Sequence, residues 1–148
     1  MLLSLQHSRS GMQRLLPALS ASFLVASPLR SFASVPDSVI DVHTDAQFES
    51  LLAEMKEKQQ VGVLDFTAKW CGPCRTIAPH FSRLSIQHPH VKFMKLDIEA
   101  PGLSKTVQGH GITAMPTFII YKGATRVGQI VGANLDQLKK LIQIHSSS

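Results

Sequence analysis

The 148-residue chain has only two cysteines, one tryptophan and one tyrosine, so it is poor in residues that build cross-links and aromatic surfaces. Two cysteines exclude the disulfide framework of a small secreted domain, which needs several pairs. They also argue against a four-ligand zinc site, because His88 and His90 lie closer together than zinc-finger spacing requires. No window of about 20 mostly apolar residues is present. The sequence therefore predicts no metal and no membrane-spanning helix.

Acidic residues are missing from the first 36 positions, where Arg9, Arg14 and Arg30 are the only charged side chains. All ten Asp and Glu residues come later, together with 12 of the 15 Lys and Arg residues. The net charge of +5 is therefore largely a property of the N-terminus. No basic stripe with interleaved aromatic residues follows, so nucleic acid is not expected as a partner.

The N-terminal segment has the composition of an organellar transit peptide, rich in leucine and serine and free of acids. Apolar side chains at helical spacing form one face of a predicted amphipathic helix: Met12, Leu15, Leu16 and Leu19. We therefore predict that residues 1–32 are a mitochondrial transit peptide, disordered or removed, and that residues 33–148 form one domain. The predicted location is the mitochondrial matrix.

Other interpretations of this segment stay open. A secretory signal needs an uninterrupted apolar stretch, which Arg14 and Pro17 break here. A tail without a targeting role and a plastid address are further alternatives. The letters RSFAS, residues 30–34, resemble sites cut by the mitochondrial processing protease, which places the expected cleavage near Phe32–Ala33.

From position 38 onward, apolar runs typical of strands alternate with segments of helical periodicity. Thr44 or Asp45 is expected to cap the first helix, Pro79 lies inside the second, and a turn around Gly123 joins the last two strands. The predicted order is β-α-β-α-β-α-β-β-α. Strands that alternate with helices indicate a parallel sheet, and the closing hairpin adds antiparallel strands. The fold class is therefore α/β with a mixed sheet.

The two cysteines form the stretch Cys71-Gly72-Pro73-Cys74 at the predicted start of a helix. A helix N-terminus favours negative charge, and the thiolate is the nucleophilic form of cysteine. Cys74 follows one turn later, within reach of Cys71, which favours redox chemistry over a buried structural pair. Gly72 lets a partner approach, and Pro73 stiffens the loop without adding a basic group, which favours a reducing couple.

Four motifs together resemble the thioredoxin family: WCGPC at 70–74, DF at 65–66, AMPTF at 114–118 and VGA at 131–133. The resemblance covers residues 38–145 and, with the N-terminal segment, is strongest to a mitochondrial thioredoxin. It implies the thioredoxin fold, a central mixed five-stranded sheet flanked by four helices.

The resemblance also implies a function, a general protein-disulfide reductase with no bound cofactor. Its electrons would come from NADPH through thioredoxin reductase, and peroxiredoxins would be among its clients. We expect a monomer that attacks with Cys71 and resolves with Cys74. Alternatives are a thiol oxidase or isomerase of a secretory compartment and a binding module built on the same fold.

Further site residues follow from the resemblance. It makes Asp65 the proton acceptor for Cys74, with Lys95 approaching that carboxylate. It makes the Met115–Pro116 peptide bond cis, so that this turn faces the cysteines. Substrate would contact the following residues: Trp70, Gly72, Pro73, Met115, Pro116 and Gly132.

Simpler interpretations of these residues remain. Asp65 could be a hydrogen-bonded core residue, Lys95 a strand-edge lysine, Trp70 plain packing and Gly132 a turn glycine. The chain also departs from the family at Thr67, where bacterial relatives often have tryptophan, so one aromatic wall of the site is absent. His110, near the substrate turn, is expected to be a surface histidine.

Overall fold

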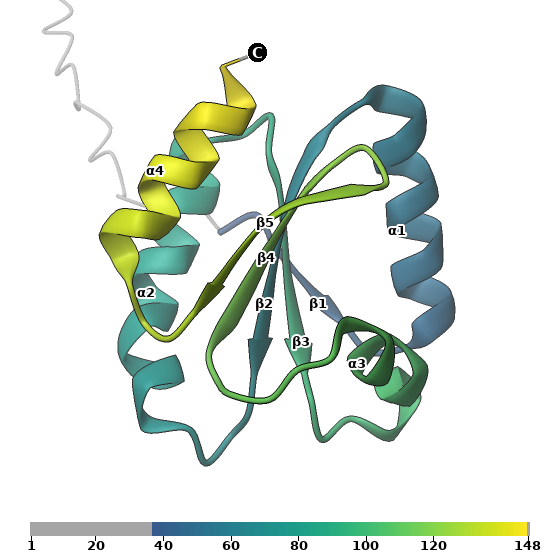
Figure 1. Ribbon diagram of the computed structural model, residues 1–148, viewed down its shortest axis with the longest axis vertical. Coiled ribbons are helices and arrows are strands. Elements are labelled where there is room, and N and C mark those ends of the chain that lie inside the picture. The colour runs from purple at the N-terminus through teal and green to yellow at the C-terminus, as the bar shows by residue number, and fades with distance from the viewer. Residues whose placement is uncertain (1–36, 148) are drawn as a thin grey trace, which may run out of the picture. The chain divides into compact units, whose positions relative to one another are not determined.

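The computed structural model describes residues 37–147, so the transit peptide predicted for residues 1–32 lies outside the described residues. The elements follow the predicted order (Figure 1). They are β1 (Val39–Val42), α1 (Asp45–Lys58), β2 (Val61–Thr67), α2 (Gly72–Gln87), β3 (Lys92–Asp97), a 3₁₀ turn (Pro101–Leu103), α3 (Ser104–His110), β4 (Thr117–Lys122), β5 (Thr125–Val131) and α4 (Leu135–Ser146).

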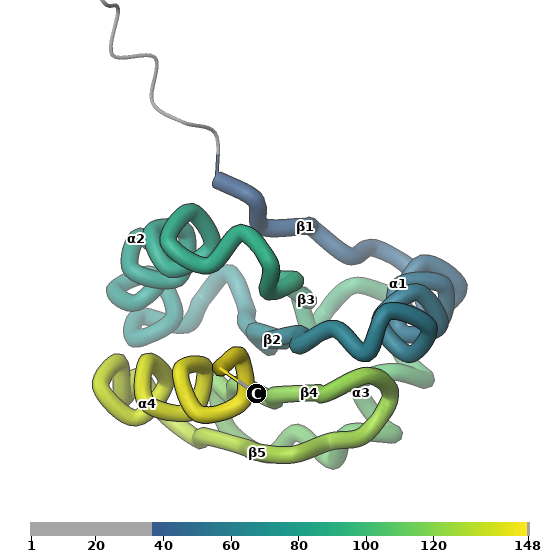
Figure 2. The backbone as a smooth tube through the Cα atoms, turned by 90° about the horizontal axis from the view of Figure 1, so that it is seen from above, coloured from purple at the N-terminus to yellow at the C-terminus, as the bar shows by residue number. Residues whose placement is uncertain are grey.

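The five strands form one sheet in the order β1-β3-β2-β4-β5. β1, β3 and β2 run parallel, whereas β4 is antiparallel to β2 and β5 is antiparallel to β4. Helices α1 and α3 cover one face of the sheet, and α2 and α4 cover the other (Figures 1 and 2). The predicted α/β class, the mixed five-stranded sheet and its four flanking helices are confirmed.

Each face of the sheet has its own apolar core, and β2 contributes to both because successive side chains of a strand point to opposite faces. Val63 packs with α2 and α4. Leu64 and Phe66, which point to the opposite face, pack with α1 and α3. Asp65 alternates with these two, so its carboxyl group lies on the α2 face, inside an otherwise apolar strand.

Side chains at the helix starts satisfy the free backbone N–H groups there. Thr44 caps α1 by accepting a hydrogen bond from the Gln47 nitrogen at 3.1 Å, and Asn134 caps α4 in the same way. Helix α2 is capped by Cys71, and Pro79 lies within it, as predicted.

Between residues 37 and 147, no helix combines the length and apolar character that crossing a bilayer requires.

Candidate redox site

The two cysteines lie at the N-terminal end of α2, directly after β2 (Figure 1). Cys71 and Cys74 are joined by a disulfide, with their Cα atoms 5.3 Å apart. This confirms that Cys74, one helical turn on, reaches Cys71. Both residues are buried, with Cys71 4% exposed.

The sulfur of Cys71 occupies the N-cap position of α2. It accepts a hydrogen bond from the backbone nitrogen of Cys74 at 3.2 Å. When the disulfide opens, this N–H group and the helix dipole favour negative charge on the same sulfur. Pro73 lies in the first turn, where a backbone N–H has no helical acceptor and its loss costs nothing. The local sequence therefore forms a helix start that the Cys71 sulfur caps.

A second loop packs against the cysteine pair and completes the site. Met115 contacts the small cluster that contains the two cysteines, and the Met115–Pro116 bond is cis, as predicted. The Gly132 nitrogen donates a hydrogen bond to the Pro116 carbonyl oxygen at 2.8 Å, which ties the end of β5 to this loop. Gly132 has φ +93°, a conformation that favours glycine. A Cβ atom at Gly132 or at Gly72 would meet nothing within 4 Å, so both glycines face open space.

Trp70 lies on the surface beside the disulfide, with 62% of the residue exposed. Its Nε1 donates a hydrogen bond to a carboxylate oxygen of Glu99 at 3.0 Å. Val131, next to Gly132, is another exposed apolar residue. Plain core packing does not account for Trp70, because its ring is held at the surface by a polar contact.

Asp65 is only 2% exposed, and its Oδ1 has no hydrogen-bond partner within the described part of the chain. Burial raises the pKa of Asp65 to about 7, and the charge of Lys95 acts in the opposite direction. An unpartnered oxygen does not fit a simple hydrogen-bonded core residue. The site therefore holds a carboxyl group that can exchange a proton near neutral pH.

Lys95 lies beside Asp65 across the β2–β3 pair, as the resemblance implied. Its ammonium nitrogen, however, is 2.7 Å from a carboxylate oxygen of Asp41 on β1. No local sequence pattern indicates this competing partner.

Thr67 and Cys74 line one pocket of about 380 Å³ together with Lys69, Arg75 and Asp97. A tryptophan in place of Thr67 would add a large ring to this wall. The pocket therefore lies at the position where the sequence predicted a missing aromatic wall.

The prediction of a surface position for His110 is wrong. Its ring packs against Phe48 and Phe66, with centroids 5.4 and 5.1 Å away. Its Nδ1 lies 2.6 Å from the Thr106 carbonyl oxygen, and its Nε2 lies 2.8 Å from the Tyr121 hydroxyl. Burial lowers the pKa of His110, which favours the neutral ring in this apolar niche. The last turn of α3 rests on the core, and only the tertiary packing reveals this.

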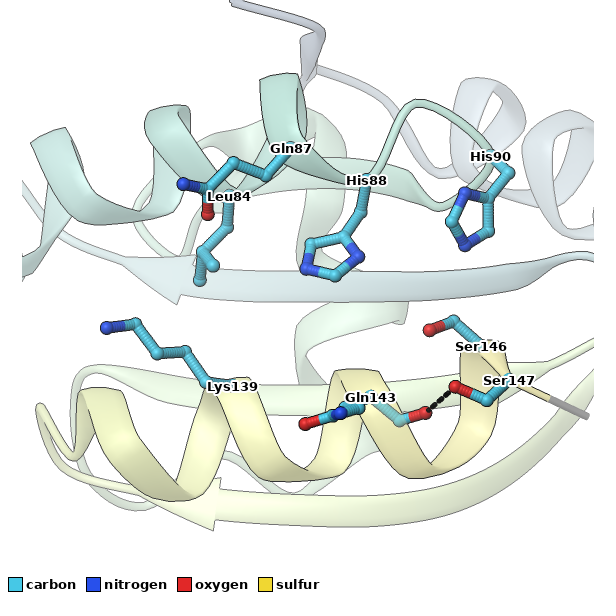
Figure 3. Close-up of a pocket in the computed structure, with 8 residues that line it drawn as sticks. All are labelled: Leu84, Gln87, His88, His90, Lys139, Gln143, Ser146 and Ser147. Atoms are coloured by element: carbon cyan, nitrogen blue, oxygen red, sulfur yellow. Dashed lines mark hydrogen bonds between the residues drawn. The ribbon is translucent and has the colours of Figure 1, made fainter.

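Another pocket, of about 450 Å³, lies between the C-terminal parts of α2 and α4 (Figure 3). His88 and His90 line it from one side, and Lys139 and Gln143 from the other. His88 ends α2 at about 25 Å from Cys71, judged from the rise of the helix. The pocket is therefore separate from the redox pair.

Among residues 37–147, no group of three or more His, Cys, Asp or Glu side chains is placed to hold a metal ion.

Comparisons with known proteins agree on one family. A family model described as Thioredoxin matches residues 39–144. Thioredoxin H-type of Chlamydomonas reinhardtii is 42% identical over 112 residues, covering 75% of this chain and 97% of the relative. Thioredoxin O1, mitochondrial, of Arabidopsis thaliana is 37% identical over 115 residues, covering 78% of this chain and 59% of the relative.

Solved structures of similar proteins have the same fold. A thioredoxin from Nicotiana alata superposes with a TM-score of 0.71 at 35% identity, covering 76% of this chain and 96% of that one. Oxidized thioredoxin O1 from Arabidopsis thaliana gives a TM-score of 0.68 at 37% identity, covering 73% and 97% of the two chains.

The buried carboxyl group predicts a distinctive pH dependence of stability. Folded Asp65 keeps its proton up to about pH 7, whereas an aspartate in the unfolded chain loses it near pH 4. Between these pH values the unfolded state binds fewer protons, so stability falls as pH rises, by up to about 4 kcal/mol. Asp65→Asn should remove this loss and be more stable than the wild type at pH 8, with little difference at pH 4.5.

Urea denaturation of the oxidised proteins at several pH values measures the effect. Asp136→Asn, at an exposed site on α4, is the matched control and should not change the slope of stability with pH. A difference between Asp65→Asn and wild type that is the same at pH 4.5 and pH 8 would contradict the prediction.

Proposed function

The chain belongs to the thioredoxin family of dithiol–disulfide oxidoreductases, and from that premise we propose that Cys71 and Cys74 reduce disulfides in a broad range of proteins. One observation carries the proposal: the disulfide closes at the start of α2, with the cis-proline loop packed against it. The chain is a protein-disulfide reductase. The roles of its individual residues, its electron source and its location are the proposed part.

The exchange proceeds in two steps. The thiolate of Cys71 attacks one sulfur of a target disulfide, forms a mixed disulfide and releases the other target sulfur as a thiolate that takes a proton. The thiol of Cys74 then loses its proton and attacks the Cys71 sulfur. This breaks the mixed disulfide and releases the second target thiolate. Two electrons pass to the target, and the Cys71–Cys74 disulfide is left behind.

Asp65 accepts the proton that Cys74 loses, directly or through a water molecule. A general base works best when its pKa lies near the working pH, and burial brings that of Asp65 to about 7. Lys95 tunes this carboxyl group through its charge. Support for these roles comes from the burial of Asp65 and from its unpartnered oxygen.

The substrate lies over the surface around the disulfide. The residues that we propose contact it are Trp70, Gly72, Pro73, Met115, Pro116 and Gly132. The exposure of Trp70 and the open space at both glycines support this assignment. An exposed rim of this kind is accessible to many unrelated chains.

We further propose that no cofactor is bound and that thioredoxin reductase, drawing on NADPH, returns electrons to the oxidised pair. Peroxiredoxins are proposed among the clients, and the protein is proposed to act as a monomer. Gly72 and Pro73 support the direction of electron flow, because no basic side chain between the cysteines stabilises the reduced thiolate further.

The proposed location is the mitochondrial matrix, reached through a transit peptide in residues 1–32. The acid-free, arginine-containing composition of that segment supports this. So does the relative named as mitochondrial thioredoxin O1, although the H-type relatives carry no such word in their names.

Turnover of insulin disulfides with NADPH and thioredoxin reductase tests the exchange. The wild type should reduce insulin. Cys71→Ser should be inactive because the attacking sulfur is lost, whereas Cys74→Ser should accumulate a mixed disulfide with the target through Cys71. Mass spectrometry identifies the linked cysteine. An inactive wild type rejects the reductase function, and trapping by Cys71→Ser through Cys74 would reverse the two roles.

A reporter fused behind residues 1–36 tests the location. We expect import into mitochondria, because the membrane potential draws the positively charged segment inward. A matched fusion in which Arg9, Arg14 and Arg30 are replaced by Gln should stay outside. Delivery of the first fusion to the secretory pathway or to plastids would reject the mitochondrial proposal.

A further inference from the structure

Three ionisable side chains occupy one row across three neighbouring parallel strands. Asp41 on β1 is the register partner of Lys95 on β3, and Lys95 is also the register partner of Asp65 on β2. Register partners in a sheet point to the same face. The single ammonium group therefore stands between two carboxyl groups that compete for it.

The structure shows which of the two carboxyl groups forms an ion pair with Lys95. The Lys95 nitrogen lies 2.7 Å from Asp41, at the solvent side of the row, where the side chains of Lys95 and Asp41 are 44% and 54% exposed. Asp65, at the inner end, is 2% exposed and has an oxygen without a hydrogen-bond partner. The ion pair thus forms at the outer carboxylate and leaves the inner one without a cation.

A small cavity of about 80 Å³ connects the members of the row. All three line it, and Ala78, Phe81 and Ser82 of α2 close it from above the sheet. A cavity of this size has room for a water molecule. An ammonium group that left Asp41 would therefore have space and polar surroundings on the side of Asp65.

The charged groups that line this cavity come from β1, β3 and the residues before β1. They are Asp41, Lys95 and Asp37, and the Asp37 carboxylate accepts a hydrogen bond from the Ser82 hydroxyl at 2.6 Å. Helix α2 contributes Ser82 but no charge to the lining. Lys95 is thus the only cation among the residues that line the cavity.

Two opposing effects act on the position of the ammonium group. An exposed ion pair such as Lys95–Asp41 is weak, because water screens it. Moving the ammonium group to Asp65 would gain a stronger attraction in a less polar place, but it would also remove the ammonium from water. Because these two effects oppose each other, the Asp41 charge at the solvent edge adds to the side that keeps the ammonium group in water.

We propose that Asp41 is a positioning residue, which holds the Lys95 ammonium at the solvent edge of this cavity and so leaves Asp65 without an ion pair. The proposal rests on the proposed role of Asp65 as proton acceptor, because the position of Lys95 affects the reaction only through Asp65. A carboxylate paired with lysine is a poor base near neutral pH, since the cation stabilises its ionised form. Asp41 thereby keeps Asp65 able to take the Cys74 proton and to return it.

The direct test is the titration of the Asp65 carboxyl carbon, followed by ¹³C NMR in the oxidised protein. Asp41→Asn keeps the shape of the side chain and removes its charge. The released ammonium should then move toward Asp65, and the titration midpoint should fall by on the order of one pH unit. Glu49→Gln, which removes the carboxylate of the exposed Lys105–Glu49 pair, is the matched control and should leave the midpoint unchanged.

A double-mutant cycle separates the movement of Lys95 from the loss of the Asp41 charge alone. In a Lys95→Met background no ammonium is left to move, so Asp41→Asn should shift the midpoint by only a small part of its effect in the wild type. No shift in the wild-type background, or an equal shift in both backgrounds, overturns the proposal.

The pH profile of insulin reduction distinguishes this inference from the role of Asp65 itself. If Asp65 accepts the proton, the profile of Asp41→Asn should move with the NMR midpoint. If the midpoint moves in a Lys95-dependent way and the profile does not, Asp41 positions Lys95 but Asp65 is not the proton acceptor. That result supports the positioning role and rejects the proton-transfer part of the proposed function.

Discussion

The hydrogen bond from the Cys74 nitrogen to the Cys71 sulfur, 3.2 Å long, makes this sulfur the cap of helix α2. A capping atom must lie within hydrogen-bond reach of the free N–H groups, so its position follows from the helix itself. The same geometry places Cys74 one turn deeper, within disulfide reach. The residues proposed to cover the disulfide, accept the proton and contact the substrate all lie around this helix start.

The sheet leads into the helix start, and it also carries Asp65, the proposed proton acceptor. Strand β2 ends just before Cys71, and its alternation puts Asp65 on the face that α2 covers. Burial there destabilises the charged carboxylate, which is unfavourable for folding above neutral pH but gives Asp65 a pKa suited to proton exchange. Stability and function therefore oppose each other at this residue.

Much of the site could be predicted from the sequence because its signals are local. Three of them lie within a few residues: the Cys71–Cys74 spacing, the proline in the first turn of α2, and a cap at Thr44 or Asp45. The cis bond in AMPTF follows from the family resemblance instead. The alternation of strands and helices likewise gave the mixed sheet. These features depend on neighbours along the chain, which a sequence displays directly.

The features that escaped prediction depend on contacts between distant segments. His110 is polar and ends a short helix, which suggests the surface, yet α3 turns it onto Phe48 and Phe66. The partner of Lys95 is determined by the register of β1 against β3, and no local pattern shows that register. Strand pairing and helix orientation thus decide which charges meet in this site.

The central claim, that the helix start activates Cys71 and not Cys74, is tested most directly by alkylation of the reduced protein. Iodoacetamide is added at pH 7, and mass spectrometry follows the label on each cysteine over time. The sulfur that caps the helix should react first, because thiolate character and access control the rate. We expect Cys71 to be labelled at least roughly tenfold faster than Cys74. Equal rates, or faster labelling of Cys74, would contradict the account.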